Sequence, residues 1–226
     1  AALGEDIQKA YGSAAPVAVL PDGVDLSQAD AGTPVFQESA SPALLYLGSL
    51  HRWKGIETLM EAMRWVDAAT LFIAGGPERR ITDLQRLART LGVEGRVRFL
   101  GTVPPAERFS VVKGADICLL PLTRVSIAAR YTSPLKLFEY MAAGKPVVVS
   151  DLPSTREVLT DEREALMVDA ENPAAFADAI NRLLADEQLR GALGTAARER
   201  VQEFTWAARA RRIVDHINKI AGKAAN

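Results

Sequence analysis

Several features that mark common protein classes are scarce in this 226-residue sequence. The single cysteine, Cys118, excludes a disulfide within the chain and a cysteine-based metal site. The two histidines, His51 and His216, are far apart, which argues against a histidine-rich metal site. No apolar run approaches the roughly 20 residues that span a bilayer, and no basic-then-apolar leader opens the sequence. We therefore expect a cytoplasmic-type protein with no bound metal and no membrane span.

An excess of charge of one sign is also absent. The net charge is −1, so no basic field favours a nucleic-acid partner or an anionic membrane surface. The apolar fraction of 48% and the charged fraction of 24% are those of an ordinary globular protein that buries one substantial core. Cys118 lies in the apolar run ADICLLPL, and we expect it to be a buried core thiol.

What is present is a regular alternation of apolar segments and amphipathic segments. We predict strands at 16–20, 43–50, 69–76, 97–101, 115–122, 146–150 and 165–169. We predict helices at 1–11, 55–66, 78–91, 105–113, 134–143, 154–159, 173–186, 188–203 and 205–221. Strands that are apolar throughout and alternate with helices indicate a parallel sheet covered on both faces. Right-handed crossovers make this an α/β fold with a doubly wound, Rossmann-like sheet.

The composition divides the chain into three regions. Residues 1–42 are a lead-in that ends in a linker at 26–42, which is rich in Ser, Ala, Asp and Pro and has no sustained period. Residues 43–203 hold the alternating strands and helices, and residues 204–226 hold a last helix. That helix carries an apolar stripe: Trp206, Ile213, Ile217 and Ile220.

The stretch RYTSPLKLFEYMAAGKPVVVSD, residues 130–151, holds a helix start, a helix stop and a buried strand. Ser133 offers a hydroxyl to cap free N–H groups, with a proline after it, and Gly144 suits the helix stop. Lys136 is misplaced for stability, because the helix dipole favours negative charge in the first turn. A phosphate bound at this helix start would explain it. The alternative is a solvated pair with Glu139, and the residues alone leave both interpretations open.

Small residues cluster where the predicted strands end: Gly48, Ser49, Gly75, Gly101 and Thr102. Because the carboxyl ends of parallel strands share one sheet edge, their backbone N–H groups suit a phosphorylated ligand there. Lys54, in HRWKG, opens a second helix on this edge, and a diphosphate would explain both lysines. The alternative is a solvated loop lysine with its stem along Trp53. No G-x-G-x-x-G follows the first sheet strand and no Walker motif is present, which argues against dinucleotide oxidoreductases and P-loop NTPases.

Three further charged residues are candidates for contacts with a ligand, and each can also be explained as an ordinary structural residue. Glu139, one turn inside its helix, is placed to accept hydrogen bonds from ribose hydroxyls. Arg130 is either a phosphate contact or a loop charge, and Glu157 is interpreted as an exposed helix residue. No Ser-His-Asp or Cys-His constellation is recognisable, so nucleophilic catalysis finds no support.

The motifs LLYLGSLHRWKG, LFIAGGPE, VRFLGTVP, ADICLLPL and SPLKLFEYMAAGKPVVVSD occur in this order, and FTW follows them. Their combination resembles the group 1 retaining glycosyltransferases of GT-B architecture, from the PDGVD turn at residue 21 to the C-terminal helices. The resemblance maps onto the C-terminal half of such two-domain enzymes. It implies a hexosyltransferase-type enzyme of the kind used in polysaccharide biosynthesis, whose final helix would cross back to a missing N-terminal domain.

The resemblance also implies a donor site for a UDP-sugar or GDP-sugar that needs no metal. Glu139 matches the glutamate that holds the donor ribose, and Lys54 matches the lysine that contacts the diphosphate; we interpret both as catalytic. Backbone N–H groups at Leu135 and Lys136 match the helix-terminus contacts, and the loop from Gly101 to Val103 matches the part that meets the base. The acceptor, a sugar, a lipid or a small molecule, would bind through the missing domain, and the full-length protein could lie peripherally at the inner membrane face.

Two positions depart from the family pattern. Tyr131 stands where the first glutamate of the family's paired-glutamate motif is expected, and Ser49 stands where an arginine is expected. Arg130 or Arg52 could compensate for the lost diphosphate contact. These departures leave two alternatives to the transferase: a non-catalytic nucleotide-sugar-binding or interaction domain, and a GT-B-type nucleotide-sugar epimerase, which the C-terminal pattern fits less well.

Overall fold

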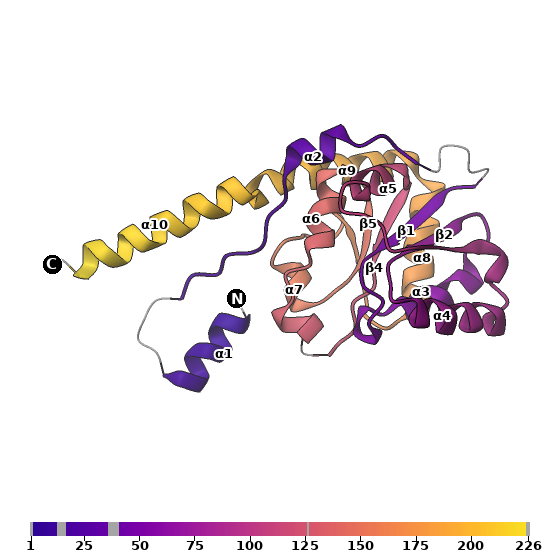
Figure 1. The fold of residues 1–226 in the computed structure, drawn as a ribbon, viewed down its shortest axis with the longest axis horizontal. Coiled ribbons are helices and arrows are strands. Elements are labelled where there is room, and N and C mark those ends of the chain that lie inside the picture. Colours follow the sequence, from indigo (N-terminus) through magenta and orange to yellow (C-terminus); the bar gives the residue numbers. More distant parts are fainter. Residues whose placement is uncertain (1, 13–16, 36–40, 126, 225–226) are drawn as a thin grey trace.

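A sheet of six parallel strands lies at the centre of the computed structural model, which describes residues 2–12, 17–35, 41–125 and 127–224. Helices cover both faces of the sheet (Figure 1). The strands are β1 (Ala43–Leu47), β2 (Thr70–Ala74), β3 (Val97–Gly101), β4 (Ile117–Leu120), β5 (Val147–Ser150) and β6 (Leu166–Val168). Their order is β3-β2-β1-β4-β5-β6, and every pair is parallel. This order is that of a doubly wound nucleotide-binding sheet and confirms the predicted Rossmann-like α/β fold.

The helices follow the predicted alternation closely. They are α1 (Ala2–Tyr11), α2 (Leu26–Ala31), α3 (Ile56–Ala62), α4 (Glu78–Leu91), α5 (Arg108–Gly114), α6 (Leu135–Ala142), α7 (Pro153–Arg156), α8 (Pro173–Ala185), α9 (Glu187–Arg200) and α10 (Trp206–Ala224). Short 3-10 turns lie at η1 (Arg52–Lys54), η2 (Met63–Trp65), η3 (Glu94–Arg96) and η5 (Val201–Phe204), and η4 (Ile127–Tyr131) is a π-helical turn. Asn172 caps the start of α8, because its side chain accepts a hydrogen bond from the N–H of Ala175 at 3.1 Å.

Alternate residues of each strand build two separate cores. Leu45 and Leu47 of β1 face a cluster that includes α5 and α6, whereas Leu44 and Tyr46 face a cluster that includes α3, α4 and α8. The strands are apolar throughout because both faces of the sheet are covered. Cys118 of β4 is fully buried, and burial raises the pKa of its thiol, which confirms the predicted core thiol.

The lead-in region differs from two of the predictions. Residues 17–20 form no strand, and Val17 and Val19 are exposed, because none of the described residues pairs with this segment. The expected linker contains the short helix α2, whose start is capped by the Asp25 side chain accepting from the N–H of Ser27 at 3.0 Å. Pro16 of the expected strand and residues 36–40 of the expected linker lie outside the described residues.

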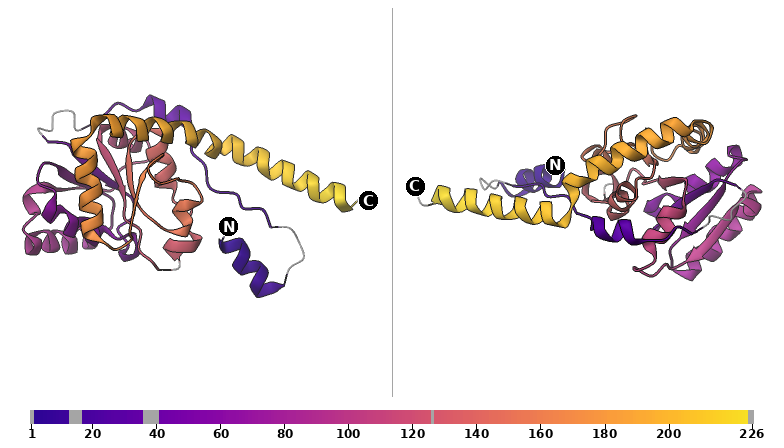
Figure 2. Two further views of the ribbon diagram at one scale, coloured as in Figure 1. Left: turned by 180° about the vertical axis from the view of Figure 1, so that it is seen from behind. Right: turned by 90° about the horizontal axis from the view of Figure 1, so that it is seen from above.

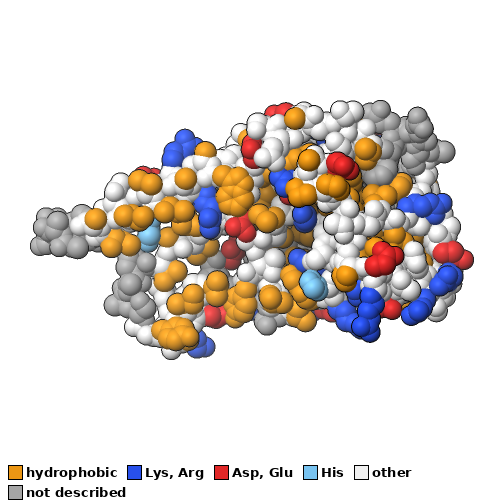
Figure 3. Space-filling model, in the orientation of Figure 1, with side chains coloured by type: hydrophobic (Ala, Val, Ile, Leu, Met, Phe, Trp, Pro, Cys, Tyr) orange, Lys and Arg blue, Asp and Glu red, His pale blue; other side chains and the backbone are white. Residues whose placement is uncertain are grey.

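Both ends of the described chain extend away from the sheet. Figure 2 shows α10 pointing away from the rest of the molecule in both views, and α1 standing apart from the sheet on the same side. Hydrophobic side chains line the projecting α10 in Figure 3, and Val214, Ile217 and Ile220 are exposed. The predicted apolar stripe is therefore present, and the helix does not fold back onto the sheet.

Candidate functional site

The strand order reverses between β1 and β4, so the crevice expected of an open parallel sheet lies at the carboxyl ends of these strands. Residues 48–55 follow β1 at this edge, and residues 121–134 follow β4 and lead into α6. The two segments are in close contact at Gly55. Its φ is +69°, and a Cβ there would lie 1.8 Å from the carbonyl oxygen of Pro121. Thr123 also donates through its hydroxyl to the carbonyl of Trp53 at 3.0 Å, so the two loops are held against each other.

The glycines that follow the first three strands lie together. Gly48 donates to the carbonyl of Ala74 at 2.9 Å, and Gly75 donates to the carbonyl of Gly101 at 2.7 Å. Gly75 has φ +153°, and a Cβ there would lie 1.8 Å from the carbonyl oxygen of Gly48, so only glycine fits. A Cβ on Gly48 would lie 3.8 Å from the Lys136 side chain. The predicted clustering is thus seen: Lys136 of α6 lies beside the glycine that ends β1.

Lys54 and Lys136 form an electropositive pair at this edge. Burial, and secondarily the charge of Lys136, lower the pKa of Lys54 to about 8. The Lys54 ammonium lies 3.9 Å from the centre of the Trp53 ring. The contact with Trp53 that the alternative interpretation of Lys54 predicts is therefore also present. Within the described residues, no ion pair joins Lys54 to a carboxylate. Two cations held together without a full complement of anions attract a multiply charged anion.

Glu139 lies between two cations. Its side chain is almost fully buried; Lys136 Nζ lies 3.2 Å from Oε2, and Arg108 Nε lies 3.3 Å from Oε1. The pair of Lys136 with Glu139, given above as the alternative to a phosphate contact, is therefore present, but its carboxylate is buried rather than solvated. Sequence reasoning missed Arg108 altogether, because it lies on α5 and no motif or spacing relates it to α6.

The start of α6 is fixed by its own backbone and by the sheet. Leu137 donates to the carbonyl of Pro134 at 2.9 Å, which leaves the N–H groups of Leu135 and Lys136 before it without an acceptor inside the helix. The buried hydroxyl of Tyr140 accepts from the N–H of Leu47 at 2.9 Å and ties α6 to the end of β1. Burial raises the pKa of Tyr140. The helix terminus is thereby held at the crevice with two N–H groups that have no acceptor inside the helix.

Three other predicted site residues contact the N-terminal segment instead. Arg130 Nη2 donates to Asp6 of α1 at 3.1 Å, and the Tyr131 hydroxyl donates to Asp6 Oδ2 at 2.7 Å. The hydrogen bonds from Tyr131 and then from Arg130 lower the pKa of Asp6. Ser133 does not cap α6: its hydroxyl accepts from the N–H of Asp22 at 3.0 Å, and Pro134 occupies the position before the helix. Arg130, Tyr131 and Ser133 line a cavity of about 390 Å³, and residues of α1 form part of its wall.

The remaining predicted residues lie at the same sheet edge. The carbonyl of Ser49 accepts from the Tyr46 hydroxyl at 2.7 Å, and its side chain is exposed. Thr102 is exposed beside Gly76, where a Cβ would lie 2.9 Å from the threonine hydroxyl, and Val103 packs partly into the core. The described part of the chain contains no group of three or more residues suited to a metal ion, and none of its helices is long and apolar enough to cross a membrane.

Comparison with known proteins gives concordant results. Residues 41–186 match the family described as glycosyl transferases group 1. The D-inositol 3-phosphate glycosyltransferase of Corynebacterium urealyticum is 30% identical over 230 residues, which cover 93% of this chain and 53% of that protein. The chain thus spans about half the length of this relative.

Two solved structures share the fold. Anabaena HepE in complex with UDP-glucose superposes with a TM-score of 0.80 at 19% identity, over 93% of this chain and 60% of that one. The C-terminal domain of the group 1 glycosyl transferase LpcC from Francisella tularensis superposes with a TM-score of 0.65 at 19% identity, over 80% of this chain and 97% of that one. Together with the matched family residues and the doubly wound sheet, these similarities show that the chain belongs to the group 1 family of glycosyl transferases.

Proposed function

We propose that this chain is the donor-binding half of a retaining glycosyltransferase, which transfers a sugar from a nucleoside-diphosphate sugar to an acceptor hydroxyl. The observation that carries the proposal is the position of Lys54 and Lys136. Both lie at the switch point of the sheet, where the charge of Lys136 contributes to the lowered pKa of Lys54. The nearby start of α6 offers free N–H donors to the same anion.

Each part of the donor has a matching part of the site. The diphosphate binds between Lys54 and the N–H groups of Leu135 and Lys136. Glu139 accepts hydrogen bonds from the ribose hydroxyls through its carboxylate. The loop from Gly101 to Val103 meets the base. The lysines and the helix terminus stabilise the departing diphosphate by charge, a role that in other transferases falls to a metal ion. The complex of HepE with UDP-glucose supports a UDP-sugar as donor, with a GDP-sugar as the alternative.

The acceptor site and the retaining chemistry are assigned to the part of the protein that this chain does not span. The isolated chain therefore binds nucleoside diphosphates and transfers little or no sugar. The other half of the protein, which would bind the sugar, lipid or small-molecule acceptor, would pack against the apolar stripe of α10.

Calorimetric titration with UDP and GDP tests the donor site. We expect one of the two to bind at millimolar concentration or below, and Lys54→Ala and Glu139→Ala to remove the binding while circular dichroism remains that of the folded chain. Absence of binding by both nucleotides, or equal binding by the folded variants, contradicts the proposal.

The second candidate is a nucleotide-sugar-binding domain without catalysis. It is favoured by Tyr131, which brings no carboxylate of its own and whose hydroxyl is occupied by Asp6. Transfer activity of the full-length protein that is abolished by Glu139→Ala would exclude this candidate. Release of a free epimerised sugar in the same assay would instead identify an epimerase.

A further inference from the structure

Glu139 is a buried carboxylate whose two oxygens face two different cations. Lys136, on the same helix, contacts Oε2, and Arg108 of α5 contacts Oε1. A buried carboxylate loses the solvation that keeps it ionised in water, so it needs a positive partner or it takes up a proton. In the structure this requirement is met twice.

The two cations differ in what else they are needed for. Lys136 stands at the start of α6 beside Gly48, where the proposed diphosphate binds. Its ammonium carries three N–H groups, and any of them that turns to a phosphate oxygen is no longer available to Glu139 Oε2. A diphosphate carries more charge than a carboxylate, so it competes effectively for Lys136. Donor binding would then leave Glu139 with one partner fewer.

Arg108 is held in place independently of the donor. Its Nη2 donates to Gln28 Oε1 of α2 at 2.7 Å, and Gln28 is itself held by a 3.2 Å hydrogen bond to Asp25. The guanidinium thereby spans α2, α5 and α6. Its Nε–H is buried, and the 3.3 Å contact to Glu139 is an ion pair without hydrogen-bond geometry, so this donor has no hydrogen-bond acceptor within the described residues. Arg108 thus has unused capacity to tighten on Oε1.

We propose that Arg108 is the positioning residue of the ribose-binding glutamate. It holds the Glu139 carboxylate in place through Oε1, so that Oε2 is free to accept a hydrogen bond from a ribose hydroxyl when the diphosphate draws Lys136 away. Arg108 itself does not touch the donor. This inference rests on the proposed function, and it adds to it a residue that determines discrimination between ribose and deoxyribose nucleotides.

The test measures binding of UDP, 2′-deoxy-UDP and 3′-deoxy-UDP to the wild-type chain and to three variants. We expect the wild type to bind UDP about tenfold more tightly than at least one deoxy analogue, because a hydrogen bond to a charged group is lost. We expect Arg108→Gln to weaken the binding of UDP about tenfold and to bring the ratio of the affinities for the deoxy analogue and for UDP close to one. Arg108→Lys, which keeps the charge, restores most of the ratio.

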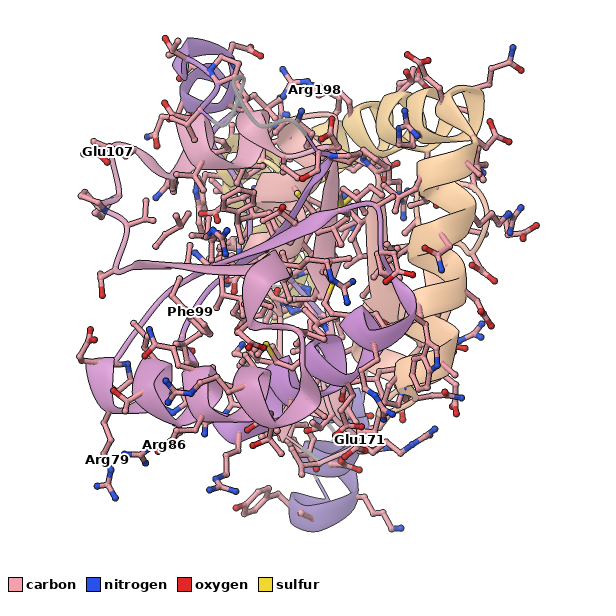
Figure 4. All side chains as sticks on the ribbon, turned by 90° about the vertical axis from the view of Figure 1, so that its right-hand side faces the viewer. Arg79, Arg86, Phe99, Glu107, Glu171 and Arg198 are labelled. Carbon is pink, nitrogen blue, oxygen red and sulfur yellow. The ribbon has the colours of Figure 1, made fainter. Side chains whose placement is uncertain are left out.

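Arg79→Gln is the matched control. Arg79 is exposed and points from α4 into solvent (Figure 4), so its replacement leaves the ratio unchanged. Folded Arg108→Gln protein with the wild-type ratio would show that Arg108 is only a structural ion pair and would overturn the inference, while UDP binding by the wild type leaves the proposed function standing. A wild type that binds UDP without distinguishing the analogues overturns the inference alone. If the wild type binds GDP instead of UDP, the same series is run with GDP and its deoxy analogues, and binding of neither nucleotide overturns both proposals.

A second measurement serves if Arg108→Gln does not fold. In a crystal structure of the wild-type chain with UDP, we expect Arg108 to remain on Glu139 Oε1, Lys136 to contact the diphosphate, and a ribose hydroxyl to lie on Oε2. Arg108 displaced from Glu139, or Lys136 still paired with it beside bound ribose, overturns the inference.

Discussion

If the donor site is as proposed, the lowered pKa of Lys54 makes the binding of a nucleoside diphosphate depend on pH. Burial, followed by the charge of Lys136, brings this pKa to about 8, so the free ammonium is mostly protonated at about pH 7 and mostly neutral at about pH 9. A bound diphosphate favours the charged form and raises the pKa again. Binding therefore takes up protons, and the affinity for UDP falls as the pH rises through the pKa that Lys54 has in the chain without nucleotide.

The size of the effect follows from the two pKa values. If the diphosphate restores the ordinary lysine value of 10.5, UDP binds about tenfold more weakly at about pH 9 than at about pH 7. Calorimetry at both pH values measures this ratio. Lys54→Arg is the control, because its guanidinium stays charged over the whole range and any loss that it shows comes from the nucleotide or from other groups.

The comparison of wild type with Lys54→Arg shows whether the Lys54 ammonium causes the pH dependence. We expect the wild type to lose about tenfold more affinity than the variant between the two pH values. Equal losses in both proteins, or a wild-type affinity that does not change with pH, would refute the view that the Lys54 ammonium contacts the bound anion.

Three predictions concern the stability of the framework that carries the site, each measured as the free energy of unfolding in urea. Gly75→Ala places a Cβ 1.8 Å from a carbonyl oxygen and costs about 3 kcal/mol or more, whereas Gly95→Ala, with open space around its Cβ, changes little; similar values for the two would contradict the packing argument. Tyr140→Phe leaves a buried N–H of β1 without its hydroxyl partner and costs about 1–3 kcal/mol, while Tyr131→Phe alters an exposed bond and stays within about 0.5 kcal/mol. Asn172→Ala removes the cap of α8 and costs about 1 kcal/mol, and an unchanged unfolding midpoint would show that the cap is dispensable.

The sheet and most helices could be predicted because their signals are local. Apolar runs such as 43–47 and the inward spacing of Leu84 and its neighbours in α4 depend only on the chain next to them. The clustering of Gly48, Gly75 and Lys136 was also predictable, since parallel strands place their carboxyl ends at one edge.

What could not be predicted depends on contacts between distant segments. Arg108 meets Glu139 because α5 packs beside α6, and no sequence spacing encodes that contact. Residues 17–20 have the composition of a strand, but a strand also needs a partner, and the described residues provide none. The pairing of Arg130 with Asp6 likewise joins the turn η4, in the middle of the chain, to the N-terminal helix α1.

Amide chemical-shift changes of the isotopically labelled chain on addition of UDP locate the donor site residue by residue, because backbone N–H groups are themselves proposed to bind the nucleotide. We expect the largest changes on the amides of Gly48, Gly75, Thr102, Leu135 and Lys136, and we expect Lys54→Ala to reduce them together. Changes that cluster instead on α1 and residues 17–21, around the cavity beside Tyr131, would contradict a donor site at the switch point of the sheet.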